Sequence, residues 1–258
     1  MVALLAAALV LGTTAGATAD SAARATTGCQ HVVVPSYFYS GSGWRRAIGS
    51  KPPPGVMFLN VDNGPGSSPL AHFQSLVRRA HAAGISVLGY SSTVYGQRPI
   101  AAVEADVRHY KDWYKVNGMM LDLAAATASE LPYYRKLARY IRREIPGSAV
   151  WLNPGTYPDR RYLSVADVVL VFEGSYASYR QLQVPRWVGH FRPARFADVI
   201  YATSGPRLTS AIRLSRADRA GYVYFTNLAG ANPYSALPSY WRREAAAVPA
   251  DCSSSGQS

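Results

Sequence analysis

The sequence predicts a single-domain α/β fold, a closed parallel (β/α)8 barrel of the TIM type. Eight short runs rich in Val, Ile, Tyr or Phe occur along the chain, and amphipathic segments with helical spacing lie between several of them. With 258 residues, of which 48% are hydrophobic and 16% charged, the chain is long enough for one such domain. An open doubly wound sheet is the alternative, but no G-x-G-x-x-G turn follows the first run to support a dinucleotide site.

Most of the eight runs are almost continuously apolar, which is typical of strands buried on both faces of a parallel sheet. The expected strands are 31–39, 55–62, 85–93, 118–124, 149–155, 167–174, 198–205 and 221–227.

Three amphipathic segments predict helices, at 68–84, 99–116 and 129–145. Gly84 ends the first, Pro99 begins the second, and Pro146 follows the third. The connection 156–166 is too short for a full helix, and the one around 43–49 is also slight.

Residues 1–19 form an apolar stretch that ends in Ala17-Thr18-Ala19, which predicts a cleaved signal peptide and a secreted protein without an integral membrane span. No Lys or Arg precedes the apolar run, so a lipid anchor or an atypical signal is the alternative. We expect segments 20–28 and 253–258 to be disordered and the barrel to occupy 29–252.

The two cysteines, Cys29 and Cys252, lie where the barrel is expected to begin and end. A barrel brings its first and last elements together, and an exported chain can be oxidised. We therefore expect a Cys29–Cys252 disulfide rather than two free thiols.

The charge balance is basic, with 27 Lys and Arg against 15 Asp and Glu and a net charge of +12. Much of the excess is in Arg pairs on expected helices or loops, which favours a solvated outer face over attraction to an anionic polymer. No nucleic-acid-binding motif appears, and the five His residues lack metal-binding spacing. We expect a monomer with no cofactor and no metal.

Two carboxylates stand directly at the ends of apolar runs, Asp122 after MML and Glu173 after LVF. Active sites of parallel barrels lie at the carboxyl ends of the strands. Either acid could instead cap a helix or pair with an Arg, but two carboxylates at one rim are what glycoside hydrolysis requires. We expect Glu173 to be the general acid, its pKa raised by apolar neighbours such as Val171 and Phe172, and Asp122 to be the stabilising or nucleophilic carboxylate.

Other polar side chains at the strand ends are candidate sugar-binding residues, since tyrosine rings can stack on sugars, although packing must explain most of the 18 tyrosines. The candidates are Tyr37, Asn60, Asp62, Tyr90, Tyr95, Asn153, Thr203 and Tyr224. No G-x-S-x-G turn offers a serine nucleophile.

Five motifs at successive strand ends together resemble the spherulin-4-like (spherulation-specific) family, which includes glycoside hydrolase family 135. They are NVDNGPG (60–66), GYSSTVYGQR (89–98), GMMLDLA (118–124), WLNPGT (151–156) and VFEGSY (171–176). The resemblance covers roughly 31–245 and implies a barrel that hydrolyses α-1,4-linked N-acetylgalactosamine within galactosaminogalactan, an exopolysaccharide.

The resemblance also implies the site, because the family's strand-four Asp falls on Asp122 and its strand-six Glu on Glu173. The family typically has Asp-Glu at strand four, whereas this chain has Leu123 in the second position. Either Glu173 supplies the proton alone, or the barrel binds carbohydrate with weak or no turnover. A partly deacetylated, cationic chain would be repelled at +12, so a neutral acetylated or acidic glycan suits the charge better.

Overall fold

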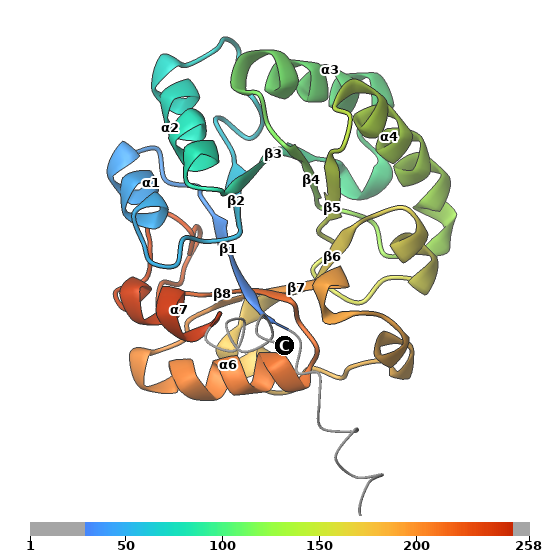
Figure 1. Cartoon of the computed structure of the whole chain (residues 1–258). Coiled ribbons are helices and arrows are strands. Elements are labelled where there is room, and N and C mark those ends of the chain that lie inside the picture. Colours follow the sequence, from blue (N-terminus) through green and yellow to red (C-terminus); the bar gives the residue numbers. More distant parts are fainter. Residues whose placement is uncertain (1–28, 250–258) are drawn as a thin grey trace, which may run out of the picture.

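Eight parallel strands form a closed barrel in the computed structural model, which describes residues 29–249 (Figure 1). The strands are β1 (His31–Pro35), β2 (Val56–Leu59), β3 (Ser86–Ser92), β4 (Gly118–Asp122), β5 (Ala149–Leu152), β6 (Val168–Ser175), β7 (Phe196–Tyr201) and β8 (Tyr222–Phe225). β1 pairs with β8 as well as with β2, and His31 lies opposite Tyr222. The predicted barrel is confirmed, and the open sheet is wrong.

Most strands end earlier than the sequence predicts, so the polar ends of the apolar runs lie in loops. Seven of the eight strands end before the residue at which the sequence predicts their carboxyl end. The exception is β6, which continues to Ser175. These loops gather at the carboxyl end of the barrel, where parallel strands place their following residues.

Helices surround the barrel on the outside (Figure 1). They are α1 (Gly41–Ile48), α2 (Ala71–Ala82), α3 (Ile100–His109), α4 (Leu131–Glu144), α5 (Tyr176–Tyr179), α6 (Leu208–Ala217) and α7 (Trp241–Ala247). A π-helical segment, Tyr110–Tyr114, continues α3. The connection between β5 and β6 holds a short 3-10 helix, Arg160–Ser164, in place of a full helix, as expected.

Large rings fill the barrel, so its interior is a packed core and not a pore. Trp151 contacts Phe58 and Tyr222, with ring centroids 5.5 Å and 4.7 Å away. On the outer side of β3, the ring of Tyr110 packs on Gly89, where an added Cβ would lie 2.5 Å from the ring. The glycine lets the helical layer approach the strand closely.

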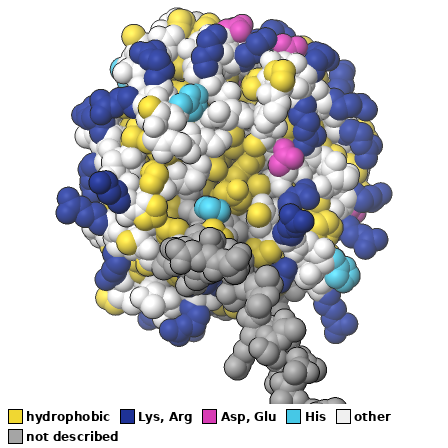
Figure 2. All heavy atoms as spheres, in the orientation of Figure 1, with side chains coloured by type: hydrophobic (Ala, Val, Ile, Leu, Met, Phe, Trp, Pro, Cys, Tyr) yellow, Lys and Arg dark blue, Asp and Glu magenta, His cyan; other side chains and the backbone are white. Residues whose placement is uncertain are grey.

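Lys and Arg side chains spread around the outer edge of the molecule, while the centre of the face in view is mostly hydrophobic (Figure 2). This distribution fits a solvated outer surface. Within the described residues, no helix is long and apolar enough to cross a membrane.

Several predictions concern residues outside the described range. The signal peptide at 1–19, the segments 20–28 and 253–258, and Cys252 all lie there. The Cys29–Cys252 disulfide therefore stays a prediction.

Candidate active site

The two carboxylates predicted from the sequence lie side by side and share one hydrogen-bond donor. Asn153 follows β5, and its Nδ2 donates to Asp122 Oδ1 at 2.7 Å and to Glu173 Oε2 at 2.6 Å. Because both oxygens contact the same nitrogen, they are separated by at most about 5 Å. Asp122 and Glu173 thus form a close pair.

The orientation of Asn153 is fixed by its surroundings. Its Oδ1 accepts from the backbone N–H of Gly155 at 3.0 Å, which leaves the amino group for the carboxylates. The residue is buried, and its backbone N–H donates to the carbonyl of Leu121 at 2.9 Å. The bridge is therefore held by the end of β5.

Each carboxylate also accepts a tyrosine hydroxyl. Tyr90 donates to Asp122 Oδ2 at 2.8 Å, and Tyr234 donates to Glu173 Oε1 at 2.9 Å. Tyr37 contacts both tyrosine rings edge-on, with centroid distances of 5.6 Å to Tyr90 and 5.8 Å to Tyr234. Two tyrosines thus orient the pair, and the Tyr37 ring packs against both of them.

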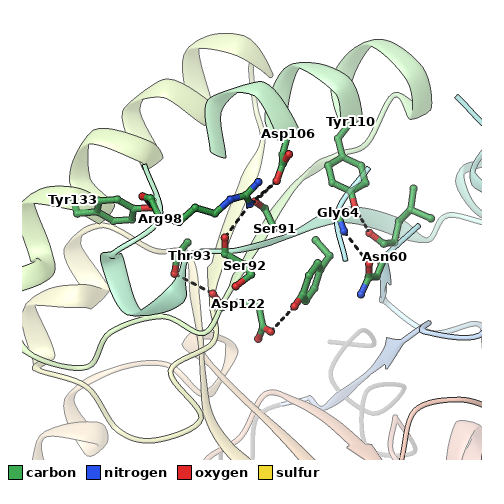
Figure 3. Close-up of polar contacts among 12 residues, drawn as sticks. Asn60, Gly64, Ser91, Ser92, Thr93, Arg98, Asp106, Tyr110, Asp122 and Tyr133 are labelled. Carbon is green, nitrogen blue, oxygen red and sulfur yellow. Dashed lines mark hydrogen bonds and ion pairs between the residues drawn. The ribbon is translucent and has the colours of Figure 1, made fainter. Parts of the chain in front are cut away.

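The backbone around Asp122 is anchored from β3 (Figure 3). Thr93 Oγ1 lies within hydrogen-bond distance of the carbonyls of Asp122, at 3.0 Å, and of Leu123, at 2.9 Å. Behind the strand, Arg98 pairs with Asp106 at 2.7 Å and donates to the carbonyl of Ser92 at 3.0 Å. This network fixes the loop that follows β3 against the end of β4.

The surroundings raise the pKa of both carboxyl groups above their ordinary values. For Asp122 the cause is burial, which the hydrogen bonds from Tyr90 and Asn153 partly oppose. For Glu173 the main cause is again burial, and the negative charge of Asp122 raises its pKa further. A raised pKa on Glu173, to which the negative charge of Asp122 contributes, is the property that a general acid needs.

A cleft with a volume of about 470 Å³ opens beside this pair. Its described lining is Tyr37, Tyr39, Asn60, Asn63, Tyr90, Glu173, Tyr201 and residues 230–234. The lining contains no Lys, Arg or His, so the cleft is acidic although the chain is strongly basic. Among residues 29–249, no group of three or more His, Cys, Asp or Glu side chains could hold a metal ion.

The structure brings some of the predicted binding residues to this site. Tyr37, Asn60 and Tyr90 line the cleft, and Asn153 bridges the carboxylates. Asp62 is exposed outside the cleft lining.

Thr203 and Tyr224 are not at the cleft, contrary to expectation. Both side chains are fully buried. The carbonyl of Thr203 accepts from the hydroxyl of Tyr240 at 2.7 Å, while the Tyr224 ring packs near Tyr234, with centroids 6.4 Å apart. Both side chains therefore lie in the packed interior behind the cleft lining.

Several cleft residues were not among the candidates, and two of them are tyrosines that end a strand or that the site depends on, Tyr201 and Tyr234. Tyr201 ends β7, two residues before the chosen Thr203, and Tyr234 lies in the long loop after β8. The polar, aromatic sequence Asn232-Pro233-Tyr234 is the signal that could have indicated the second, since loops at this end carry function.

Beside Asp122 the rim carries three exposed hydrophobic residues, Val94, Tyr95 and Leu123, which we term the apolar rim patch. All three have left-handed backbone conformations, with φ of 47°, 55° and 46°. Such conformations cost about 1–3 kcal/mol each for non-glycine residues and cluster at functional sites. The backbone N–H of Tyr95 donates to the carbonyl of Leu123 at 2.6 Å and joins the two loops.

Comparison with known proteins agrees with this architecture. The model of the spherulation-specific family 4 matches residues 31–248. Spherulin-4 of Physarum polycephalum is 31% identical over 231 residues, which cover 84% of this chain and 69% of that protein.

Solved structures show the same barrel. The crystal structure of Aspergillus clavatus Sph3 in complex with GalNAc matches with a TM-score of 0.74 and 25% identity, over 84% of this chain and 96% of that one. Dispersin B matches with a TM-score of 0.51 over 86% of this chain and 97% of its own; at 8% identity it shows the fold alone. The chain belongs to the spherulation-specific family 4.

Proposed function

We propose that this protein is a secreted, endo-acting glycoside hydrolase of an amino-sugar exopolysaccharide that contains N-acetylgalactosamine, as galactosaminogalactan does. The observation that carries the proposal is the close pair of Asp122 and Glu173 at a cleft, bridged by Asn153. The similar Sph3 structure, which holds GalNAc, supports a carbohydrate-active protein and this class of sugar.

Glu173 acts as the general acid in this proposal. It protonates the glycosidic oxygen as the bond from that oxygen to the anomeric carbon breaks, and then, as a carboxylate, it removes a proton from the incoming water. Its raised pKa, caused by burial and by the charge of Asp122, favours the protonated form that the first step needs.

Asp122 stabilises the positive charge that develops on the sugar. The nearest oxygens of the two acids are at most about 5.3 Å apart, because both contact Asn153 Nδ2, and this fits the spacing of about 5–5.5 Å typical of retaining enzymes. Retention needs a nucleophile, which is either Asp122 itself or the acetamido oxygen of the sugar, oriented by Asp122.

The acidic cleft and the basic surface set different preferences for the glycan. The surface disfavours a long cationic polymer at a net charge of +12. The cleft lining has no Lys, Arg or His to bind an anionic sugar, and the carboxylate of Asp122 beside Glu173 would repel one. A neutral, N-acetylated segment satisfies both.

A catalytically silent carbohydrate-binding barrel is the second candidate, and Leu123 is the observation that favours it. Leu123 is exposed and directly follows Asp122. A Glu at this position would give the site a third carboxylate that could act as a proton donor. In this case the cleft would bind the glycan without cleaving it.

Hydrolysis is tested by incubating the secreted protein with N-acetylated and deacetylated amino-sugar polymers and measuring new reducing ends. We expect release from the acetylated polymer that is lost in Asp122→Asn and in Glu173→Gln. Asp62→Asn is the matched control, since Asp62 is an exposed carboxylate outside the cleft lining. Activity that survives both site substitutions would exclude this pair.

The same experiment separates the two candidates. Binding without release by the wild-type protein, together with release by Leu123→Glu, would identify a silent barrel that lacks only a proton donor. Export is tested independently by sequencing the amino terminus of the protein from the culture medium, which is expected to begin after Ala19.

A further inference from the structure

A second concave surface lies on the outside of the barrel, between its first and last helices. The groove has a volume of about 660 Å³ and is lined by two arginine pairs, Arg45-Arg46 of α1 and Arg242-Arg243 of α7. α1 and α7 lie side by side where the barrel closes (Figure 1), and the indole N–H of Trp241 donates to the carbonyl of Arg46 at 3.4 Å. We call this surface the arginine groove.

No side chain within the described part of the chain neutralises the positive charge of the arginine groove. Across residues 29–249, none of the ion pairs involves these four arginines, and the groove lining contains no Asp or Glu. Glu244, the next residue in α7, is fully buried, and its Oε1 accepts from the backbone N–H of Phe225 at 2.8 Å. Its carboxyl group is thus directed to β8 and away from the groove.

A lack of carboxylate partners is common among the surface arginines: the ion pairs within residues 29–249 include only the arginines Arg98, Arg142, Arg143 and Arg161. Arg142 lies 3.1 Å from Asp167, and Arg161 lies 2.9 Å from Asp159. Four like charges in one concavity repel one another unless an anion binds there, and a concave surface of one sign concentrates its field. The groove differs from an ordinary solvated helix face because two arginine pairs from two helices line one concavity.

The wall formed by α7 is rigidly built. Arg243 donates to the carbonyl of Gly205, and its guanidinium lies 5.7 Å from the centre of the Tyr240 ring. The Tyr240 hydroxyl is in turn bonded to the carbonyl of Thr203, and Trp241 is buried. At Gly205, an added Cβ would lie 3.2 Å from the Arg243 guanidinium, so the absence of a side chain leaves room for it.

We propose that the arginine groove binds an anionic polysaccharide through its carboxylate or sulfate groups, at a site separate from the catalytic cleft. Guanidinium groups match the geometry of such anions with two parallel hydrogen bonds. Two pairs on two helices fit charges repeated along a polymer better than a single small ion. The proposal does not depend on hydrolysis at Asp122 and Glu173.

The groove chemistry favours a glycan over a single-stranded nucleic acid. Binding of bases requires exposed aromatic faces on which they can stack. Here Trp241 is buried, and Arg243 lies over the ring of Tyr240. No free stacking surface remains among the described lining residues.

Binding is tested with fluorescently labelled polygalacturonate, which carries carboxylates, and dextran sulfate, which carries sulfates; neutral dextran is the reference. Arg45→Ser/Arg46→Ser and Arg242→Ser/Arg243→Ser each remove two groove charges. Arg78→Ser/Arg79→Ser removes two exposed charges from α2 and is the matched control. Thermal melting verifies that each variant is folded, and the α1 variant leaves the Arg243–Gly205 contact intact.

We expect each groove variant to weaken binding of at least one anionic polymer about tenfold or more, which corresponds to about 1.4 kcal/mol, and the control to weaken it less than about twofold. Hydrolysis of a short neutral oligosaccharide should be unchanged in the groove variants, so failure of one proposal does not imply failure of the other. Equal weakening in the control would assign the attraction to net charge and overturn the groove. Absence of binding, or tighter groove-dependent binding of a single-stranded oligonucleotide, would overturn the anionic-glycan proposal.

Discussion

Replacement of Asn153 by Ala removes the one group that contacts both carboxylates. The side-chain nitrogen donates to Asp122 at 2.7 Å and to Glu173 at 2.6 Å, and both bonds are lost together. The carboxylates keep their tyrosine partners, Tyr90 and Tyr234, so the site is weakened and not dismantled.

The loss has a predictable size and a predictable sign on pH. A hydrogen bond to a charged group contributes about 1.5–3 kcal/mol, so losing two such bonds is expected to lower kcat/KM by about 100-fold or more. Asn153 lowers the pKa of both carboxyl groups, against the larger effect of burial. Without Asn153 both pKa values rise further. The low-pH limb of the activity profile, set by ionisation of Asp122, and the high-pH limb, set by ionisation of Glu173, should therefore both move to higher pH.

The assay is the initial rate of reducing-end release across the pH range for wild type, Asn153→Ala and a matched control. Asn60→Ala is that control, since Asn60 lines the same cleft and its Oδ1 accepts a glycine N–H, from Gly64 at 3.1 Å, but it bonds to neither carboxylate. An unshifted profile in Asn153→Ala, or an equal loss in Asn60→Ala, would refute the bridging role.

Three further predictions concern single contacts. Tyr234→Phe removes a bond that lowers the pKa of Glu173, so the high-pH limb of the activity profile should move up while the low-pH limb stays in place. Burial raises the pKa of Asp198 to about 7, so between about pH 4 and pH 7 the native state keeps a proton that the unfolded state has released. The free energy of unfolding should therefore fall by up to about 4 kcal/mol as the pH rises from about 4 to about 7. In denaturant titrations at about pH 5 and about pH 8, Asp198→Asn should show a smaller difference between the two pH values than wild type. Gly118→Ala should lower Tm sharply or prevent folding, because its Cβ would lie 2.1 Å from the backbone oxygen of Ala149; a Tm within about 2 °C of wild type would contradict this close approach.

The fold could be predicted because burial on both faces leaves a local signal, a continuous apolar run, in each strand. The same property limits the prediction of the site. A strand without polar alternation does not indicate which residues face the barrel interior, so Tyr224 was indistinguishable from exposed strand-end tyrosines. Asp122 and Glu173 were found because a carboxylate directly after an apolar run is unusual wherever it points.

Tyr234 could not be placed for a different reason. It lies nine residues after the end of β8 and reaches Glu173 only because the loop folds back over the barrel end. Spacing along the sequence carries no information on such a return. Asn153 was selected as a sugar ligand, and its bridging contacts became apparent only from the pairing of β4 with β5, which sets the end of one strand beside the other.

Leu123 links the chemistry of the pair to the choice of substrate. Asp122 and Glu173 already provide an anion and a proton donor within about 5 Å, so the proposed reaction does not require a third carboxylate at this position. The structure instead holds Leu123 in a left-handed conformation, with 40% of the residue exposed beside Asp122, through bonds to its carbonyl from Tyr95 and Thr93. Strain of about 1–3 kcal/mol at a non-glycine residue is typical of functional sites. Under the proposed function, the apolar rim patch would contact the acetamido methyl group of an amino sugar, which a deacetylated sugar lacks. The patch and the charge of the protein would then favour the same acetylated substrate.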